Sequence, residues 1–247
     1  MKNQDSWNPT KYVQKNGELK ASLKKGGVGY SSLLIASLTA KFYNSNLKMY
    51  AQGILLDLGC GNVPLFGTYR NYVDKTVCVD WNNTFHKNDF VDYYVDLNKE
   101  LPFEESSFDT VLLSDVLEHI KEPTSLWKEI NRILKQGGHL ILNVPFHYWI
   151  HEQPYDYYRY TKAALEYFAE ESNFEILILE ELGGGIEVLT DFHSKIICPK
   201  IPLIGKELAI VIQKLNLFFL KTGVGKKMLR NTSKSFALCY GLVAKKK

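Results

Sequence analysis

The stretch of residues 53–64, GILLDLGCGNVP, constrains the fold of this chain more than any other segment. Its apolar run at residues 54–58 predicts a buried strand, and Gly59 and Gly61 then allow a tight turn whose backbone N–H groups face a ligand. Pro64 suits the first turn of a helix, where its missing N–H costs nothing. Strand, glycine-rich turn and helix in this order are typical of an open α/β sheet, which binds ligands at the carboxyl ends of its strands.

The acidic residue at the end of this strand narrows the class of ligand. Asp57 stands two residues before Gly59, and its negative charge would repel a pyrophosphate but attract an ammonium group. The pattern Asp-x-Gly-x-Gly resembles motif I of the class I S-adenosylmethionine-dependent methyltransferases, and Pro64 in place of the usual third glycine occurs in some members of their type 11 group. The resemblance implies that S-adenosyl-L-methionine is bound here by Asp57, Gly59, Cys60 and Gly61.

Acidic residues also follow the next two predicted strands. Asp80 ends a strand at residues 76–80, and it lies 19 residues beyond Gly61, where a carboxylate can accept both ribose hydroxyls of either NAD or S-adenosylmethionine. Trp81 beside it can lie against an adenine face. After a third strand at residues 93–95, the resemblance implies that Asp96 and the backbone N–H of Leu97 bind the adenine.

A second motif supports the same resemblance. Residues 108–119, FDTVLLSDVLEH, are similar to motif IV of the type 11 group, in which a strand is followed by an acidic loop that carries a histidine. This resemblance adds Ser114 to the expected cofactor site and His119 to the expected catalytic residues. Several such matches in the correct order favour the methyltransferase interpretation over any single motif.

The remaining elements complete an α/β fold. A helix that begins at Pro123 and is closed by Gly137 and Gly138 leads to another buried strand at residues 139–144. Strands joined by helical crossovers imply a Rossmann-like, doubly wound sheet of seven strands, mostly parallel, and the resemblance implies an antiparallel last strand. The expected single domain, residues 1–247, comprises an N-terminal helical extension (1–45) that packs on the sheet or closes over the cofactor, a cofactor-binding core (53–180), a helical insertion between strands 6 and 7 (183–235) and the last strand (235–244).

Residues 146–161, FHYWIHEQPYDYYRYT, follow a central strand and are too polar for a core element. A similar pattern occurs in methyltransferases encoded among bacterial surface-polysaccharide and glycolipid genes, which implies a sugar, glycan or glycolipid acceptor. Methyl transfer to oxygen needs alignment and a base for the hydroxyl proton, and an imidazole titrates in the right range. His151 is the first candidate base, with Glu152 or Asp156 orienting it, and His119 is the second. The expected acceptor contacts are His147, Tyr155, Asp156, Tyr158 and Arg159, although Asp156 and Arg159 can also pair simply to hold the loop.

Basic residues are concentrated at one end of the chain. Residues 208–247 contain nine basic side chains and no acidic one, so the rest of the chain has a net charge of −6 within a total of +3. Within this region, residues 204–220 are apolar over much more than one helical stripe. Such a helix is usually buried in its own fold or in a homodimer. The second interpretation is peripheral docking of residues 196–230 on a membrane, where a lipid-linked acceptor would be presented.

Several classes of function are disfavoured. The N-terminus is polar and no run of about 18 apolar residues occurs, so the expected location is the cytoplasm, with a possible position at the inner face of the membrane. The four cysteines show no Cys-x-x-Cys spacing, and we expect a metal-independent reaction. The basic residues lie mostly at one end, and no nucleic-acid partner is expected. Two alternatives stay open: an NAD-dependent oxidoreductase or epimerase on the same sheet, and a non-catalytic adaptor.

Overall fold

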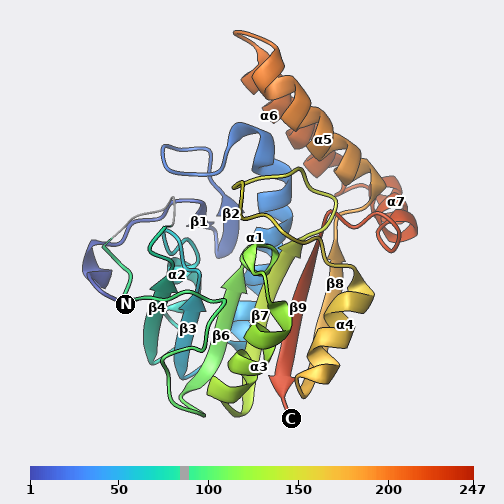
Figure 1. Cartoon of the computed structure of the whole chain (residues 1–247). Helices are drawn as coiled ribbons and strands as arrows, with labels where there is room; N and C mark the ends of the chain where they lie inside the picture. Colours follow the sequence, from blue (N-terminus) through green and yellow to red (C-terminus); the bar gives the residue numbers. More distant parts are fainter. Residues whose placement is uncertain (84–88) are drawn as a thin grey trace.

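A seven-stranded sheet forms the centre of the computed structural model, which describes residues 1–83 and 89–247 except for the side chains of residues 198 and 199 (Figure 1). The strand order is β5-β4-β3-β6-β7-β9-β8. The strands are β3 (Ile54–Leu58), β4 (Lys75–Asp80), β5 (Tyr93–Tyr94), β6 (Phe108–Ser114), β7 (Leu134–Pro145), β8 (Phe174–Leu182) and β9 (Cys239–Lys246). The pairs from β5 to β7 are parallel, whereas β9 runs antiparallel between β7 and β8. The predicted Rossmann-like sheet with an antiparallel last strand is confirmed.

The register of the parallel strands brings their carboxyl ends to one edge. Asp57 in β3 pairs with Cys78 in β4 on one side and with Leu112 in β6 on the other. Asp80 and Ser114 are the last residues of β4 and β6, so polar side chains from three strands meet at this edge. The sequence places them there because each apolar run stops at a polar residue.

Helices cover both faces of the sheet. Neighbouring residues of β3 point to opposite sides, so that Leu55 packs in one apolar cluster and Leu56 in the other. Helix α1 (Leu33–Tyr50) packs on the Leu55 side, and α3 (Pro123–Ile133) and α4 (Lys162–Glu171) pack on the Leu56 side. A four-residue helix, α2 (Phe66–Tyr69), follows the glycine-rich turn, and 3-10 turns occur at Gln4–Ser6, Tyr30–Ser32 and Leu117–His119.

Three predicted boundaries are wrong. Helix α3 ends at Ile133, and Gly137 and Gly138 lie inside β7 instead of closing the helix. The pairing register between β6 and β7 shifts there, and a Cβ on Gly138 would lie 3.0 Å from the carbonyl oxygen of Asp109, so these glycines serve a bulge. Pro64 lies before α2 and not within it, and β9 begins at Cys239, four residues later than predicted.

The predicted helical extension begins as a β-hairpin. Strands β1 (Tyr12–Lys15) and β2 (Glu18–Ala21) pair antiparallel around Asn16 and Gly17, whose φ angles are 56° and 75°. Positive φ at both positions is typical of the two-residue type I′ turn, for which Asn-Gly is the favoured sequence. The helical part of this region is α1, which continues to Tyr50.

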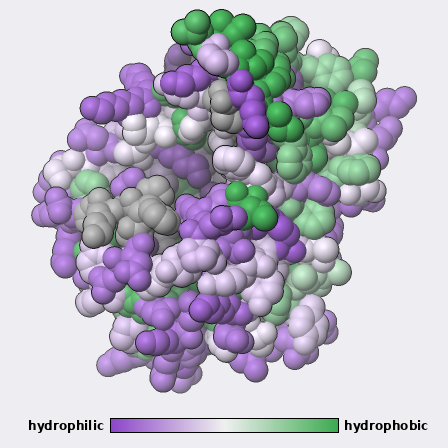
Figure 2. Space-filling view, turned by 45° about the horizontal axis from the view of Figure 1, so that its top comes forward, coloured by the Kyte–Doolittle hydropathy of each residue, from purple (hydrophilic) through white to green (hydrophobic). Residues whose placement is uncertain are grey.

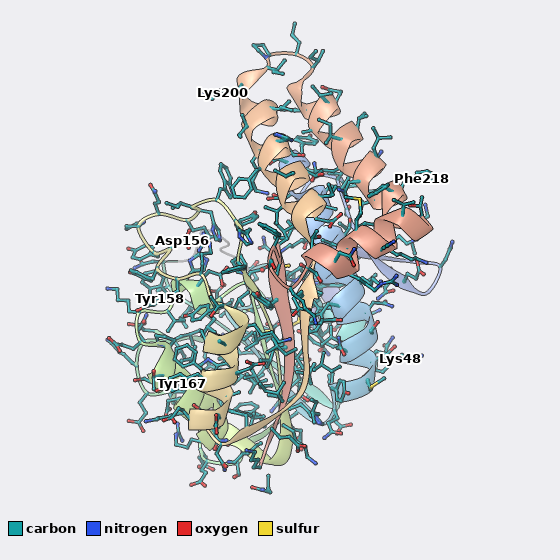
Figure 3. All side chains as sticks on the ribbon, turned by 90° about the vertical axis from the view of Figure 1, so that its right-hand side faces the viewer. Lys48, Asp156, Tyr158, Tyr167, Lys200 and Phe218 are labelled. Atoms are coloured by element: carbon teal, nitrogen blue, oxygen red, sulfur yellow. The ribbon has the colours of Figure 1, made fainter. Side chains whose placement is uncertain are left out.

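The insertion after β8 forms a protruding helical hairpin. Helices α5 (Gly185–Lys200) and α6 (Gly205–Phe219) extend beyond the body of the molecule, and α7 (Gly223–Thr232) returns the chain toward β9 (Figures 1 and 3). Among the described residues no single helix has the length and hydropathy to cross a bilayer. Helices α6 and α7 meet those criteria only as a pair, and they are bent by 96° at their junction.

Candidate functional site

A pocket of about 570 Å³ opens at the carboxyl edge of the sheet, and its volume is in the usual range for ligand sites. Every residue that the sequence assigned to the cofactor lines it. These residues come from the ends of β3, β4 and β6 and from the loops that follow the strands: Asp57, Gly59, Cys60, Gly61, Asp80, Trp81, Asp96, Leu97 and Ser114.

Asp57 is almost fully buried, with 3% of its surface exposed. The Tyr69 hydroxyl donates a hydrogen bond to Asp57 Oδ2 at 3.0 Å. Burial and the nearby negative charge of Asp80 raise the pKa of Asp57 to about 7, and the Tyr69 hydrogen bond opposes this shift only in part. A buried carboxylate of this kind is stabilised by a cationic ligand, so its position suits the ammonium group of S-adenosylmethionine.

The glycine-rich turn brings backbone close to this carboxylate. Gly59 has φ 70°, and a Cβ there would lie 2.5 Å from Val116 Cγ2, so no side chain fits. At the other end of the turn, Gly61 N donates to Asp80 Oδ2 at 3.0 Å, and Trp81 N donates to Asp80 Oδ1 at 2.7 Å. These two bonds hold the Asp80 carboxylate at the wall of the pocket, where the ribose hydroxyls of a nucleoside could approach it.

Asp96 and Ser114 occupy the sides of the pocket. Asp96 Oδ1 accepts hydrogen bonds from both the backbone N and Nδ2 of Asn98, each at 3.0 Å. Desolvation alone would raise the pKa of Asp96, but these bonds outweigh it and the pKa is lowered. Asp96 is therefore an ionised acceptor, as an adenine amino group requires. Ser114 Oγ donates to Asn143 Oδ1 at 3.0 Å.

An ion pair in the pocket wall was missed by sequence analysis. Lys11 Nζ lies 2.9 Å from Asp115 Oδ2, although the two residues are 104 positions apart. Asp115 has φ 53°, and it also accepts from Asn143, whose Oδ1 in turn accepts from the Tyr43 hydroxyl at 2.6 Å. Burial opposes ionisation of Asp115, but Lys11 outweighs it and lowers the pKa. Asp115 lies within motif IV and was open to prediction, whereas nothing near Lys11 pointed to the site.

The N-terminal region forms one side of the pocket. Residues 26–29 line it together with Ser32, Ile35, Ala36 and Thr39 around the first turns of α1. Helix α1 packs on the sheet along its length, as the first of the two alternatives expects, and its beginning also contributes to the pocket.

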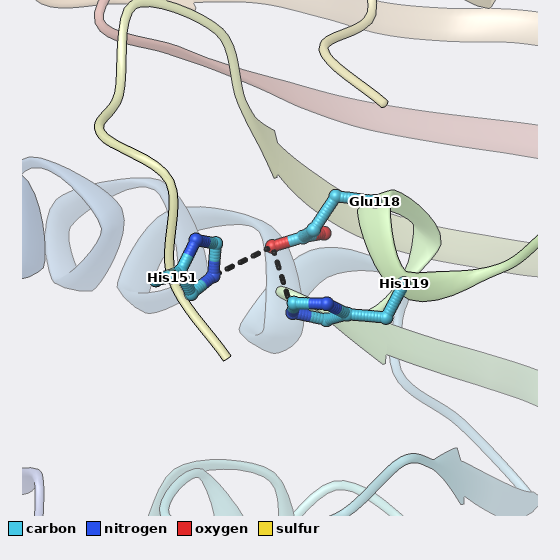
Figure 4. Close-up of side chains that lie close together, drawn as sticks. All are labelled: Glu118, His119 and His151. Carbon is cyan, nitrogen blue, oxygen red and sulfur yellow. Dashed lines mark ion pairs between the residues drawn. The ribbon is translucent and has the colours of Figure 1, made fainter. Parts of the chain in front are cut away.

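Glu118, His119 and His151 meet at the pocket (Figure 4). Glu118 Oε1 lies 3.7 Å from His119 Nε2 and 3.7 Å from His151 Nε2. Glu118 is fully buried and neither of its oxygens accepts a hydrogen bond from a residue that the structure describes, so burial, with Asp115, raises its pKa well above the ordinary range. These three residues could hold a metal ion, since one ligand atom of each lies within 4.8 Å of the others.

The two imidazoles are oriented by different partners. His119 Nδ1 lies 2.8 Å from the carbonyl oxygen of Tyr155, so Nδ1 is the donor, and in the neutral ring Nε2 is the acceptor. His151 Nδ1 lies 3.2 Å from Asp156 Oδ2, out of line for a formed hydrogen bond. Glu152 Oε2 lies 3.9 Å from His119 Nε2. Burial lowers the pKa of His151, and Asp156 opposes this only in part, so the imidazole is neutral at pH 7.

Four of the predicted acceptor contacts, His147, Asp156, Tyr158 and Arg159, are not among the residues that line the pocket. Arg159 donates from Nη1 to Asp156 Oδ1 and from Nη2 to Asp156 Oδ2, at 2.5 and 2.7 Å, so these two residues brace the loop (Figure 3). His147 Nδ1 lies 2.8 Å from the carbonyl oxygen of Ala237, and the Tyr158 hydroxyl donates to the carbonyl oxygen of Lys121. Tyr155 lines the pocket, as do the predicted catalytic residues His119, His151 and Glu152.

Comparison with known sequences identifies the core. Residues 56–142, which run from β3 into β7, match the family described as a methyltransferase domain. These residues are a methyltransferase domain. The match supports the predicted class I methyltransferase, and with it S-adenosylmethionine as the cofactor. The chain is also 30% identical over 137 residues to a thiol S-methyltransferase from Rattus norvegicus. The aligned residues make up 44% of this chain and 55% of the rat protein, so the chain spans about half the length of that relative.

Solved structures show the same fold around this methyltransferase domain. The [4+2]-cyclase SpnF has a TM-score of 0.55 at 17% identity, covering 96% of this chain and 87% of the cyclase. An S-adenosylmethionine-dependent methyltransferase from Mesorhizobium loti has a TM-score of 0.51 at 15% identity, covering 85% of this chain and all of that one. A phosphoethanolamine N-methyltransferase from Haemonchus contortus, bound to S-adenosylmethionine, has a TM-score of 0.50 at 18% identity, covering 90% and 53%.

Proposed function

We propose that this chain transfers a methyl group from S-adenosylmethionine to a hydroxyl oxygen of a sugar, glycan or glycolipid. The observation that carries the proposal is the pocket itself, which collects the expected cofactor residues and, beside them, the imidazoles of His119 and His151. The bound cofactor would supply an electrophilic methyl group.

The residues at the sheet edge hold and orient the donor. Asp57 would pair with its ammonium group, Asp80 would accept from the ribose hydroxyls, and Asp96 would accept from the adenine amino group. Each assignment is supported by the position of an acidic side chain at a different point of one pocket. The site thus fits this molecule by charge and by hydrogen-bonding capacity.

His151 is the proposed base. Its pKa is lowered by burial, so the ring is neutral at pH 7, and Asp156 beside Nδ1 favours the tautomer that leaves Nε2 free. Arg159 holds Asp156 in place and acts through it. His119 is the second candidate, with Nδ1 against a backbone carbonyl oxygen.

A sugar acceptor is supported by the aromatic side chains of the pocket. Trp81 and Tyr155 both line it and contact each other edge to face, with ring centroids 4.9 Å apart. Aromatic faces of this kind can lie against the apolar face of a sugar ring while their polar tips stay wet. A thiol acceptor is the second candidate, because the rat relative is named a thiol S-methyltransferase.

Calorimetric titration of the full chain with S-adenosylmethionine, S-adenosylhomocysteine and NAD tests the cofactor. We expect the first two to bind and NAD not to bind. Asp80→Asn should weaken S-adenosylmethionine about tenfold or more, since a charged hydrogen bond contributes about 1.5–3 kcal/mol. Glu175→Gln, an exposed change on β8, is the matched control and should have no effect. Binding of NAD alone would contradict the proposal, and binding of none of the three would favour the adaptor.

Radiolabelled methyl transfer tests the acceptor. The labelled donor is incubated with nucleotide sugars, purified glycolipids and dithiothreitol, and products are identified by mass spectrometry. A methyl ether on a sugar hydroxyl supports the proposal. Transfer to dithiothreitol alone would replace the hydroxyl acceptor with a thiol.

A further inference from the structure

Helix α6 exposes several large apolar residues. The residues that it buries are small or polar, namely Gly205, Ala209, Gln213 and Asn216. Its opposite face carries Val211, Leu215 and Phe218, and the last two are 63% and 68% exposed. Figure 3 labels Phe218 on the outer side of the helix. A helix on the surface of a water-soluble body normally shows the reverse arrangement.

The inner side of the hairpin is held by polar contacts. Gln213 Oε1 accepts from the backbone N of Leu34 at 2.9 Å, and Gln213 Nε2 donates to the carbonyl oxygen of Tyr30 at 2.8 Å. Asn216 Nδ2 donates to Thr190 Oγ1 at 2.9 Å. These satisfied bonds fix which side of α6 faces inward, and the apolar side is left to face outward.

Exposed apolar residues lie along both helices of the hairpin and at the turn between them. We call this set the hairpin face, made of Leu189, Leu203, Ile204, Val211, Leu215 and Phe218, all exposed. Leu203, at the turn between α5 and α6, is 98% exposed. Figure 2 shows apolar residues gathered over the part of the surface where these helices lie. Exposed apolar surface of this extent marks an interaction site.

Charge indicates what covers this face. Residues 196–234 contain eight Lys or Arg side chains and one acidic residue, Glu207. Lys200, Lys206 and Lys214 are exposed on the two hairpin helices. Apolar side chains bordered by lysines are complementary to the interface of an anionic membrane, where basic residues contact lipid headgroups. A second copy of the chain would bring the same positive charge to the contact.

We propose that the hairpin of α5 and α6 docks peripherally on a membrane that contains anionic lipids. Leu203 and Ile204 enter the interface first, the hairpin face lies in the headgroup region, and the lysines pair with lipid phosphates. The docking depends only on the hairpin. Its use in presenting a lipid-linked acceptor to the pocket rests on the proposed function.

Vesicle co-sedimentation of the full chain tests this docking. Vesicles of phosphatidylcholine with one third phosphatidylglycerol are compared with pure phosphatidylcholine at low and high salt. We expect binding to the anionic vesicles, weakened about tenfold or more by Leu203→Glu or Phe218→Glu and lowered by salt. Tyr167→Glu, an exposed aromatic position on α4, is the matched control and should bind like the unaltered chain.

Two further measurements make every outcome decisive. Circular dichroism and S-adenosylmethionine affinity show that the hairpin variants are folded, because none of the changed residues lines the pocket. Light scattering gives the oligomeric state without vesicles. Equal binding to both vesicle types, or a dimer that Phe218→Glu dissociates in a chain that binds no vesicle, would overturn the proposal. In the second case the face is an interface between two copies.

Discussion

The carboxyl edge of the sheet and the helical hairpin handle polar side chains in different ways. At the sheet edge, polar residues end apolar strands and face a pocket. In the hairpin, Gln213 and Asn216 face inward, while Leu215 and Phe218 face outward. In the strands the buried residues are mainly apolar and pack in the core. In α6 the large buried side chains are Gln213 and Asn216, which are held by hydrogen bonds. The difference teaches that hydrophobicity alone does not say which side of an element faces the body.

The largest expected effect compares one leucine from each region. Leu56→Ala in β3 removes a fully buried side chain and should lower the free energy of unfolding by about 2–5 kcal/mol. Leu215→Ala on the hairpin face should change it by no more than about 0.5 kcal/mol. Urea denaturation measures both. A large loss from Leu215→Ala would show that the hairpin packs on the body through its apolar side.

The next effect concerns the base at the pocket. His151→Ala should lower turnover about a hundredfold or more at saturating acceptor, with S-adenosylmethionine affinity unchanged. Since the base acts when neutral and its pKa is lowered by burial, the unaltered rate at saturating donor and acceptor should be flat near pH 7 and fall only at more acidic pH. The pH-rate profile of His119→Ala is the comparison. An unchanged rate in His151→Ala would remove this residue from the role.

Donor binding should depend on pH through Asp57. The pKa of Asp57 is raised to about 7 by burial, and an ammonium ligand needs the ionised form. Below pH 7 a proton must leave before the ligand binds, so affinity should fall by about tenfold per pH unit. Calorimetry from pH 5.5 to 8.5 measures this slope, and Asp57→Asn should abolish it. A flat profile in the unaltered chain would separate Asp57 from the donor.

The smallest expected effect is that of metal removal. We expect dialysis against EDTA to leave turnover within about twofold, because the proposed base needs no cation. The measurement is needed because Glu118, His119 and His151 have ligand atoms close enough to share a metal ion. Loss of activity that zinc or magnesium restores would make the two histidines metal ligands.

Sequence predicted the sheet edge well because its signals are local. Each strand is an apolar run that stops at an acid or a serine, and parallel register brings those stops together. The β1–β2 hairpin carried an equally local signal in Asn16-Gly17, which was overlooked. The contact of Lys11 with Asp115 had no local signal, because it joins residues 104 positions apart.

The hairpin and the acceptor loop show where local patterns stop being informative. The apolar residues of α6 were expected to be buried, but the partners that turn its polar side inward are Tyr30 and Leu34, about 180 positions away. In the loop, Asp156 and Arg159 are bonded to each other, which agrees with the alternative that they pair to hold the loop. The fold also does not decide the reaction, since a [4+2]-cyclase shares it.

One buried contact joins the two regions. Lys195 of α5 pairs with Asp191, and its Nζ lies 4.3 Å from the ring centroid of Tyr148, which lines the pocket. Helix α5 therefore contacts the wall of the pocket directly. A change in the tilt of the hairpin would reach Tyr148 through this one contact, without passing through another helix or strand.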